Sequence, residues 1–179
     1  TCLSETIGDD IPQIVSKAVE EGKVPAGKVV IHANTPSYQG SHVTGYANMV
    51  KGMVDYLATN TGRRTDAVNI IPGWVEPADM RELKRFTAAM GIKTIMYPDT
   101  SDVLDTPLTG AFQMYPKGGA TIDQIRSSGD SSHTLALGSF GAGPAATLLD
   151  TKCKVPCDIL TLPIGLRATD RFIDRLRKV

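Results

Sequence analysis

Cys2 is the residue of this chain best suited to metal chemistry, because a helix is predicted to begin a few residues after it. Iron–sulfur clusters are held by thiolates, and a nearby helix N-terminus lowers the pKa of a thiol and so favours the thiolate. The alternative role is structural, since unpaired cysteine is among the most often buried residue types. Taken alone, Cys2 is therefore predicted to be a buried structural residue, with the ligand role as the alternative.

Ser37 stands in a second stretch of interest, Thr35-Pro36-Ser37-Tyr38, which follows an apolar run. Proline and serine are both typical of turns. Taken alone, Ser37 is therefore predicted only to cap or complete a turn after Pro36.

A helix is predicted between these two residues. Asp9 or Asp10 can cap it, and Pro12 lies in its first turn, where the missing N–H costs nothing. Glu20-Glu21-Gly22 ends it. Its apolar residues have the spacing of one buried helix face: Ile11, Ile14, Val15, Ala18 and Val19.

The apolar residues 28–33 are predicted to form a strand. If another strand precedes Cys2, the two strands are parallel and joined by a right-handed crossover. Their carboxyl ends then share the edge of the sheet where α/β proteins bind ligands. On that expectation, Cys2 and Ser37 face the same crevice.

The rest of the chain alternates predicted helices with predicted strands. Short apolar runs predict strands at 68–71, 92–97, 133–137 and 159–162. Helical spacing and capping signals predict helices at 41–57, from Glu76 to Gly91, from Thr121, and at 144–149. A last helix is predicted to follow a cap at Thr169, with four residues facing inward: Phe172, Ile173, Leu176 and Val179. This alternation predicts an α/β fold of three αβα layers: Rossmann-like parallel sheets with helices on both faces.

The polar residues 59–66 are rich in turn formers and are predicted to link two units. The expected division is therefore into residues 1–66, the end of a first α/β lobe, and residues 67–179, a second Rossmann-like α/β lobe.

The composition excludes several classes of protein. Basic and acidic residues number 19 each, so the charge favours neither nucleic acid nor an anionic membrane as partner. Aromatic residues make up only 6%, which speaks against a base-stacking surface. No apolar run approaches the roughly 20 residues of a membrane-spanning helix. The three cysteines do not suggest a disulfide framework, so a reduced cytoplasmic compartment is expected.

Several separate stretches match one known family in order and spacing. They are Thr1 to Asp10, Thr35 to Tyr38, Gly40 to Met49, Leu104-Asp105-Thr106-Pro107, and Pro163 to Leu166 with Thr169-Asp170. These stretches resemble the beta chains of nitrogenase molybdenum–iron proteins, in the nitrogenase component 1 family. The resemblance spans the whole chain but only an interior part of the family's length.

The resemblance implies a role in electron transfer during nitrogen fixation. With the alpha chain, in an alpha2-beta2 heterotetramer, the beta chain holds the P-cluster, an [8Fe-7S] centre in the first lobe. This cluster relays electrons from the iron protein to the alpha chain's cofactor, which reduces dinitrogen to ammonia. The cysteine at the Cys2 position ligates the cluster, and the serine at the Ser37 position joins when the cluster is oxidised.

The same resemblance limits what the chain does alone. It implies no residue that performs the bond-making chemistry, and it places Thr6 to Asp10 near the docking surface for the iron protein. The other cluster ligands lie outside this sequence, so the isolated chain is expected to carry no cofactor and no nitrogenase activity.

Two other functions remain as alternatives. One is a scaffold paralogue on which nitrogenase cofactor is assembled, although the presence of both Cys2 and Ser37 favours the beta chain. The other is a nucleotide-binding α/β module, because the glycine-rich residues 138–143 follow a predicted strand and open a predicted helix. That stretch fits neither nucleotide fingerprint, so a tight turn is the simpler interpretation.

The remaining metal-binding residue types form no convincing set. Cys153 and Cys157 have a spacing that is not that of a zinc site and are predicted to be structural. Asp99, Asp102 and Asp105 lack the spacing, the glycine and the glutamate of a calcium loop. The three histidines, His32, His42 and His133, are scattered, although His42 is close enough to Ser37 in sequence for a supporting role.

Overall fold

The computed structural model describes residues 7–105, 107, 110–114 and 116–179. Its described strands form one sheet in the order β2-β1-β3-β4, and each pairing is parallel. The strands are β1 (Val68–Ile71), β2 (Thr94–Met96), β3 (His133–Leu137) and β4 (Cys157–Leu160). The predicted α/β class with a parallel sheet is confirmed.

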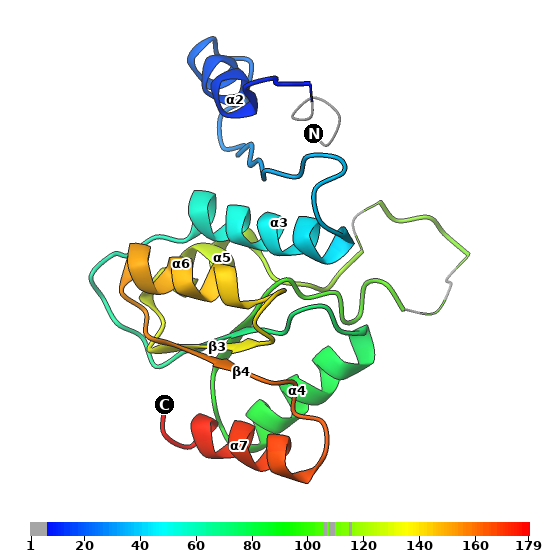
Figure 1. Ribbon diagram of the computed structural model, residues 1–179, viewed down its shortest axis with the longest axis vertical. Coiled ribbons are helices and arrows are strands. Elements are labelled where there is room, and N and C mark those ends of the chain that lie inside the picture. Colours follow the sequence, from blue (N-terminus) through cyan, green and yellow to red (C-terminus); the bar gives the residue numbers. More distant parts are fainter. Residues whose placement is uncertain (1–6, 106, 108–109, 115) are drawn as a thin grey trace.

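Helices cover both faces of the sheet (Figure 1). One face carries α3 (His42–Leu57), α5 (Ile122–Ser127) and α6 (Gly143–Cys153), and the other carries α4 (Pro77–Ala89) and α7 (Leu166–Leu176). Successive strand residues point to opposite faces, so Ile71 joins the core under α3 and α6, while Ile70 joins the core under α4 and α7. The three predicted αβα layers are present.

Most predicted elements of residues 67–179 lie where the pattern put them, but several bounds differ. β2 covers only residues 94–96 of the predicted 92–97, and α6 runs to Cys153 instead of ending at 149. β4 begins two residues earlier than predicted, at Cys157. The last helix begins at Leu166 after Gly165, so Thr169 is not its cap. Gly165 has a φ of 75°, which a glycine adopts without strain, and the Thr169 hydroxyl donates to the Gly165 carbonyl at 3.0 Å from within the helix. Of the four residues expected to face inward, Phe172 and Leu176 are buried and Ile173 is half-buried. The prediction for Val179 is wrong, because α7 ends at Leu176 and Val179 beyond it is exposed.

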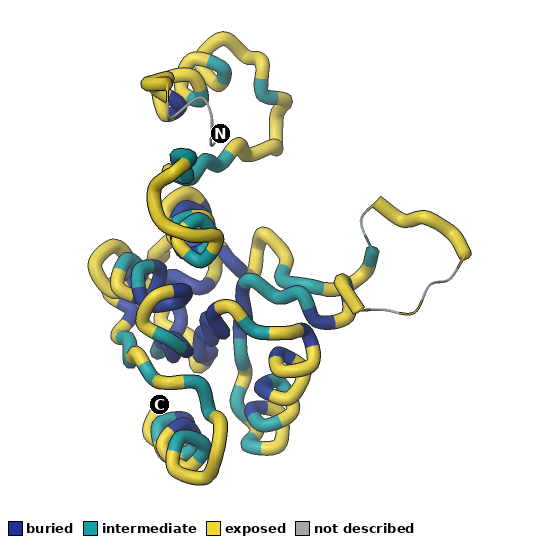
Figure 2. The backbone as a smooth tube through the Cα atoms, turned by 45° about the vertical axis from the view of Figure 1, so that its right-hand side comes forward, coloured by how far each residue is buried: buried dark blue, intermediate teal, exposed yellow. Residues whose placement is uncertain are grey.

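α2 (Ile11–Glu20) is the predicted N-terminal helix, but its apolar face is not buried. Asp10 caps it by accepting a hydrogen bond from the Gln13 amide at 3.0 Å. Of its apolar residues only Ile11 is buried, while Ile14 is 54% exposed and Val19 is 55% exposed. Figure 2 shows why: this part of the chain stands away from the layered body, and no described element covers the helix.

The predicted strand at residues 28–33 is wrong, because those residues form no regular element. A strand is stabilised by hydrogen bonds to a neighbouring strand, and these residues lie beside the side chains of α3 instead. The division of the chain at residue 66 stays a prediction; α3, which precedes it, packs against the sheet of the following residues. Every helix of the described residues is too short or too polar to cross a membrane.

Candidate functional site

Ser37 lies in a turn that leads into α3. The turn reverses the chain through two residues with positive φ, Tyr38 at 64° and Gly40 at 78°. The helix then starts after Ser41, whose amide donates to the Thr44 hydroxyl at 3.3 Å. A hollow of about 460 Å³ opens beside this turn, and the half-buried Ser37 is among the residues that line it. The predicted turn is therefore present, with Ser37 at the edge of a hollow.

The segment before Ser37 lies along one face of α3. The Asn48 side chain donates a hydrogen bond to the Asn34 carbonyl at 2.6 Å. Further along the helix, the Tyr56 hydroxyl and the His32 Nδ1 atom are 2.5 Å apart. Between these contacts, the His32 carbonyl approaches Gly52 so closely that a Cβ atom there would lie 2.7 Å from its oxygen.

An aromatic cluster fixes the first turns of α3 to the carboxyl edge of the sheet. The Trp74 ring, which follows β1, meets His42 and Tyr46 edge-on at 5.3 and 5.1 Å between ring centroids. The Tyr46 hydroxyl donates to the Gly73 carbonyl at 2.7 Å. Burial raises the pKa of Tyr46 to about 12, so this phenol stays protonated and remains a donor at neutral pH.

Cys2, the other predicted ligand, lies outside the described residues, so its approach to Ser37 stays a prediction. Within the described ranges, no group of three or more histidine, cysteine, aspartate or glutamate side chains is placed to hold a metal ion. Ser37 is among the residues that line the open hollow. A serine oxygen is a hard ligand that suits oxidised iron, and a metal ligand at this position stays a prediction.

Cys153 and Cys157 have the environment of structural cysteines. Cys153 is 1% exposed in the core under α3 and α6, and Cys157 packs against the same core. Burial raises the pKa of both thiols, which keeps them protonated at neutral pH. Because the thiolate is the metal-binding form, the predicted structural role agrees with their surroundings.

The glycine-rich residues 138–143 form a tight turn between β3 and α6. Gly138 has a φ of 99°, and its carbonyl accepts hydrogen bonds from the amides of Ala142 and Gly143 at 3.4 and 3.2 Å. A phosphate-binding loop needs such amides free to face the ligand. Here two of them are already used by the turn itself, and the absence of a phosphate site stays a prediction.

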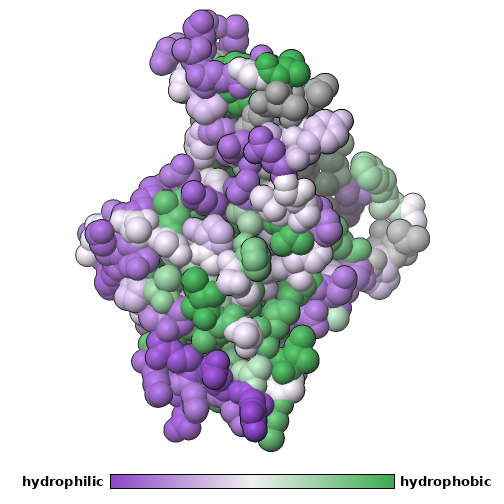
Figure 3. Space-filling view, in the orientation of Figure 1, coloured by the Kyte–Doolittle hydropathy of each residue, from purple (hydrophilic) through white to green (hydrophobic). Residues whose placement is uncertain are grey.

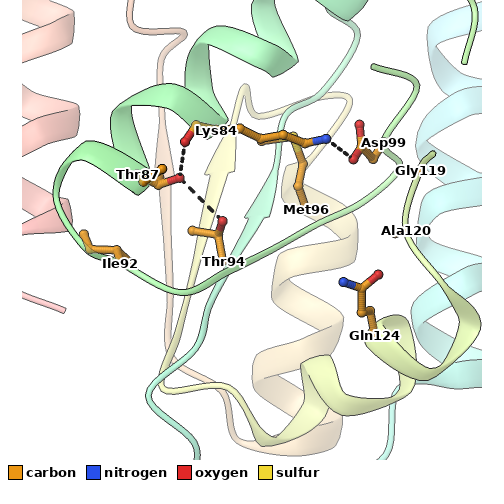
Figure 4. Close-up of a pocket in the computed structure, with 10 residues that line it drawn as sticks. Lys84, Thr87, Ile92, Thr94, Met96, Asp99, Gly119, Ala120 and Gln124 are labelled. Atoms are coloured by element: carbon orange, nitrogen blue, oxygen red, sulfur yellow. Dashed lines mark hydrogen bonds and ion pairs between the residues drawn. The ribbon is translucent and has the colours of Figure 1, made fainter. Parts of the chain in front are cut away.

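The aspartates after β2 pair with basic side chains of α4. Asp99 lies 2.5 Å from the Lys84 ammonium, which also donates to the Ser101 hydroxyl at 2.6 Å. Asp105 accepts two hydrogen bonds from Arg81, at 2.9 and 2.6 Å. Figure 4 shows Lys84 reaching Asp99 beside a hollow of about 330 Å³ at the β2 edge. The Lys84 ammonium is already paired with Asp99, so we assign this hollow no ligand.

The sequence did not indicate a cross-link around Asp158 in β4. His133 Nε2 in β3 lies 2.6 Å from the Asp158 carboxylate, and Arg175 Nε in α7 lies 2.9 Å from the same oxygen. Burial raises the pKa of Asp158, but the hydrogen bonds from Arg175 and His133 outweigh it and leave the pKa lowered. The group joins β3, β4 and α7.

Comparison with known proteins identifies the relatives of this chain. The family model for nitrogenase component 1 type oxidoreductases matches residues 1–179. The chain is 56% identical to a nitrogenase molybdenum-iron protein beta chain from Clostridium pasteurianum, over 97% of this chain and 38% of that protein. A beta chain from Methanothermobacter marburgensis is 35% identical over 100% of this chain and 40% of its own length.

The fold also matches a solved structure. Nitrogenase Cp1 superposes with a TM-score of 0.96 at 55% identity, covering 99% of this chain and 39% of the matched one. In sequence and in structure, therefore, the chain spans well under half the length of these relatives.

Proposed function

Because the chain belongs to the nitrogenase component 1 type oxidoreductase family, we propose that it is part of a nitrogenase molybdenum–iron protein beta chain. The observation that carries this proposal is its similarity to the Clostridium pasteurianum beta chain, which extends over nearly the whole sequence. The TM-score of 0.96 against nitrogenase Cp1 supports it from the fold.

The function we assign is electron relay within a cytoplasmic nitrogenase complex. Together with the alpha chain, the chain holds the P-cluster, an [8Fe-7S] centre that stores and passes on electrons when bound. Electrons arrive from the iron protein and leave for the cofactor that reduces dinitrogen to ammonia. None of the residues we assign to the site makes or breaks bonds in the substrate.

Cys2 and Ser37 are the proposed ligands, with different roles. A thiolate is soft and is the usual ligand of iron–sulfur centres, so Cys2 ligates iron in every redox state. A serine oxygen is a harder ligand and suits more oxidised iron. Ser37 therefore binds only after oxidation, when its hydroxyl gives up a proton. Its place on a half-buried turn beside an open hollow supports this assignment.

The surface of the chain supports a place in a larger assembly. Three apolar side chains in and after the loops that follow β3 and β4 are largely exposed: Phe140 at 84%, Ile164 at 78% and Leu166 at 79%. In Figure 3, apolar surface, in green, lies in the centre and lower right of the face it presents, beside a hydrophilic lower left in purple. Exposed apolar patches on proteins are typical of binding surfaces. The partners we assign are the alpha chain, in an alpha2-beta2 heterotetramer, and the iron protein.

The stretch proposed to lie near the iron-protein docking surface is Thr6 to Asp10. Thr6 is outside the described residues, and Ile7 to Asp10 are exposed, with Ile7 at 72%. An apolar side chain beside two acidic ones offers a partner both burial and charge.

The two ligand roles can be separated in the full alpha–beta complex. We expect Cys2→Ala to lower the iron content of the P-cluster and electron transfer to the partner's cofactor. We expect Ser37→Ala to keep the iron of the reduced state but to change the spectrum of the oxidised state and reduce proton release on oxidation. Metal analysis, electron paramagnetic resonance and pH-dependent redox titration measure these quantities.

Each substitution has an outcome that counts against its assignment. Full iron and normal turnover in Cys2→Ala make Cys2 a packing residue. An unchanged oxidised state in Ser37→Ala makes Ser37 only a turn residue. For the isolated chain, we expect no P-cluster and no activity, and stoichiometric iron with a cluster spectrum contradicts that expectation.

A further inference from the structure

We propose that one face of α3, formed by Asn48, Gly52 and Tyr56, consists of positioning residues that hold Ser37 at its hollow. The proposal deepens the proposed function and rests on it, because it concerns Ser37 as a redox-dependent ligand. None of the three residues is proposed to touch the cluster. They act through the backbone of residues 32–36.

The spacing of the three residues creates the binding face. Residues four apart on a helix lie one above another, so positions 48, 52 and 56 form a single row. Each member of the row meets the segment before Ser37: Asn48 binds the Asn34 carbonyl, Gly52 lies against the His32 carbonyl, and Tyr56 pairs with the His32 ring. The segment therefore follows the helix axis instead of projecting into solvent.

Gly52 is the most specific of these contacts. A glycine inside a helix costs roughly 0.5–1 kcal/mol relative to alanine, and Gly52 lies in the middle of α3. The position nevertheless cannot take a methyl group without movement, because the Cβ atom would lie 2.7 Å from a backbone oxygen and 3.4 Å from the Ala33 side chain. The close approach of the segment is thus the physical reason for a glycine here.

The row fixes one side of the turn, and the start of α3 fixes the other. Asn34 is tied to Asn48, and the Ser41 amide is tied to Thr44. Between these points the chain passes Pro36, whose ring restricts φ, and then Ser37. A ligand that binds only after oxidation must reach iron without a large rearrangement, and two fixed ends limit how far Ser37 can move. The helix that carries both anchors is itself packed on the sheet core through Val50 and Val54.

Losing the contacts that position Ser37 should affect only the oxidised state of the cluster. When oxidised, the cluster would be held by the Ser37 oxygen after the hydroxyl had lost its proton to solvent, with the added oxidant accepting the electrons. In the reduced state, by the proposed function, Ser37 is not a ligand. Loosening the row should therefore spare the reduced cluster and weaken the oxidised one, a pattern that general unfolding does not produce.

The experiment uses the full alpha–beta complex carrying Asn48→Ala, Gly52→Ala or Tyr56→Phe, with a redox dye as oxidant. We expect unchanged iron in the reduced state of Asn48→Ala. The Ser37-dependent paramagnetic signal of the oxidised state should fall roughly fivefold, the factor given by one net hydrogen bond of about 1 kcal/mol. The pH dependence of the redox potential should weaken in parallel. Tyr56→Phe, which keeps the ring and loses only the hydroxyl, should show the smallest change.

Two comparisons make the result decisive. Met49→Ala changes an exposed neighbour on α3, 38% exposed and outside the row, and should leave every readout unchanged. If Gly52→Ala lowers the iron content of the reduced state because its added methyl group overpacks α3, Asn48→Ala tests the positioning role instead. Asn48→Ala removes side-chain atoms and cannot overpack the helix. If Ser37→Ala alters the oxidised state while Asn48→Ala behaves like Met49→Ala, the positioning proposal is overturned and the proposed function stands. If Ser37→Ala alters nothing, both are overturned.

Discussion

α2 and α4 carry similar sequence signals and have different surroundings. Each begins with a cap and a proline in its first turn, and each has an apolar stripe at helical spacing. In α4 the stripe residues Met80, Leu83 and Thr87 are buried against the sheet. In α2 the corresponding stripe is largely exposed (Figure 2). The amphipathic pattern specifies a helix and an apolar face, but it does not say what covers that face.

The difference has a thermodynamic meaning. Most helical stability in proteins comes from packing of the apolar face, since short isolated helices are marginal in water. α4 therefore shares the cooperative stability of the body, whereas the ten residues of α2 contribute little to it. Regions with few buried apolar contacts open locally at low free energy, and α2 is such a region in this chain.

The largest expected difference between the two helices comes from truncating their stripes. Leu83→Ala, at a residue 4% exposed in α4, should lower the free energy of unfolding by about 2–5 kcal/mol, because it leaves a cavity. Ile14→Ala, at a residue 54% exposed in α2, should change it by less than about 0.5 kcal/mol. Urea denaturation of both variants measures the contrast. Equal losses would show that α2 packs as firmly as α4.

The two glycines of α3 extend the comparison to the helix that connects the regions. Gly52→Ala should destabilise by about 1–3 kcal/mol, since the new methyl group would meet the His32 carbonyl. Gly45→Ala places its methyl group in open space and should stabilise by up to about 1 kcal/mol through helix propensity. Thermal unfolding distinguishes the signs. A stabilising Gly52→Ala would mean that residues 32–33 do not rest on α3.

The Asp158 cross-link is a further feature of the body. Asp158→Asn should cost about 1–3 kcal/mol at neutral pH, since it weakens the hydrogen bonds that Arg175 and His133 donate to a charged acceptor. The pKa of Asp158 is lowered in the folded state, so its stabilising contribution is present above the unfolded pKa of about 3.9. It is lost as pH falls below that value and through the lowered folded pKa.

Acid titration of the unfolding free energy tests the Asp158 prediction. The native protein should lose the Asp158 contribution below about pH 4, near the unfolded aspartate pKa, and the Asp158→Asn variant should lack that component. Parallel curves for the two proteins would rule out a stabilising carboxylate at this position.

The smallest effect is expected at the α2 cap. Asp10→Ala removes the acceptor of the Gln13 amide, a change that costs a helix about 0.5–2 kcal/mol. Because α2 is not covered by the body, the loss should appear as faster hydrogen exchange in residues 11–20 with no shift in the urea midpoint. A shifted midpoint would show that α2 unfolds together with the sheet.

The sequence predicted those parts of the fold whose signals are local. β1 and β3 stand at their predicted bounds, and α5 has its predicted cap, because an apolar run or a capping box carries its own structural preference. The strand predicted at residues 28–33 failed because strand formation depends on a neighbour that the pattern does not reveal.

The site shows the same limit. The turn at Ser37 follows from Thr35-Pro36-Ser37-Tyr38, and the resemblance to a family, not the local pattern, indicated a ligand there. Asn48, Gly52 and Tyr56 are four residues apart in the sequence, but the sequence analysis did not single them out, because only the fold shows that they face residues 32–34. Likewise, nothing in the spacing of His133, Asp158 and Arg175 indicates that they meet, because their contact depends on the order of the strands.

Trp74 gives the chain an optical probe of its own. It is the one tryptophan in the sequence, so all indole fluorescence of this chain comes from the point where β1 ends and α3 begins. Its ring touches His42, which lines the hollow beside Ser37, and Tyr46, which is bonded to Gly73. The emission wavelength of an indole depends on its solvent exposure, so movement of the α3 start relative to the sheet alters the light it emits without any added label.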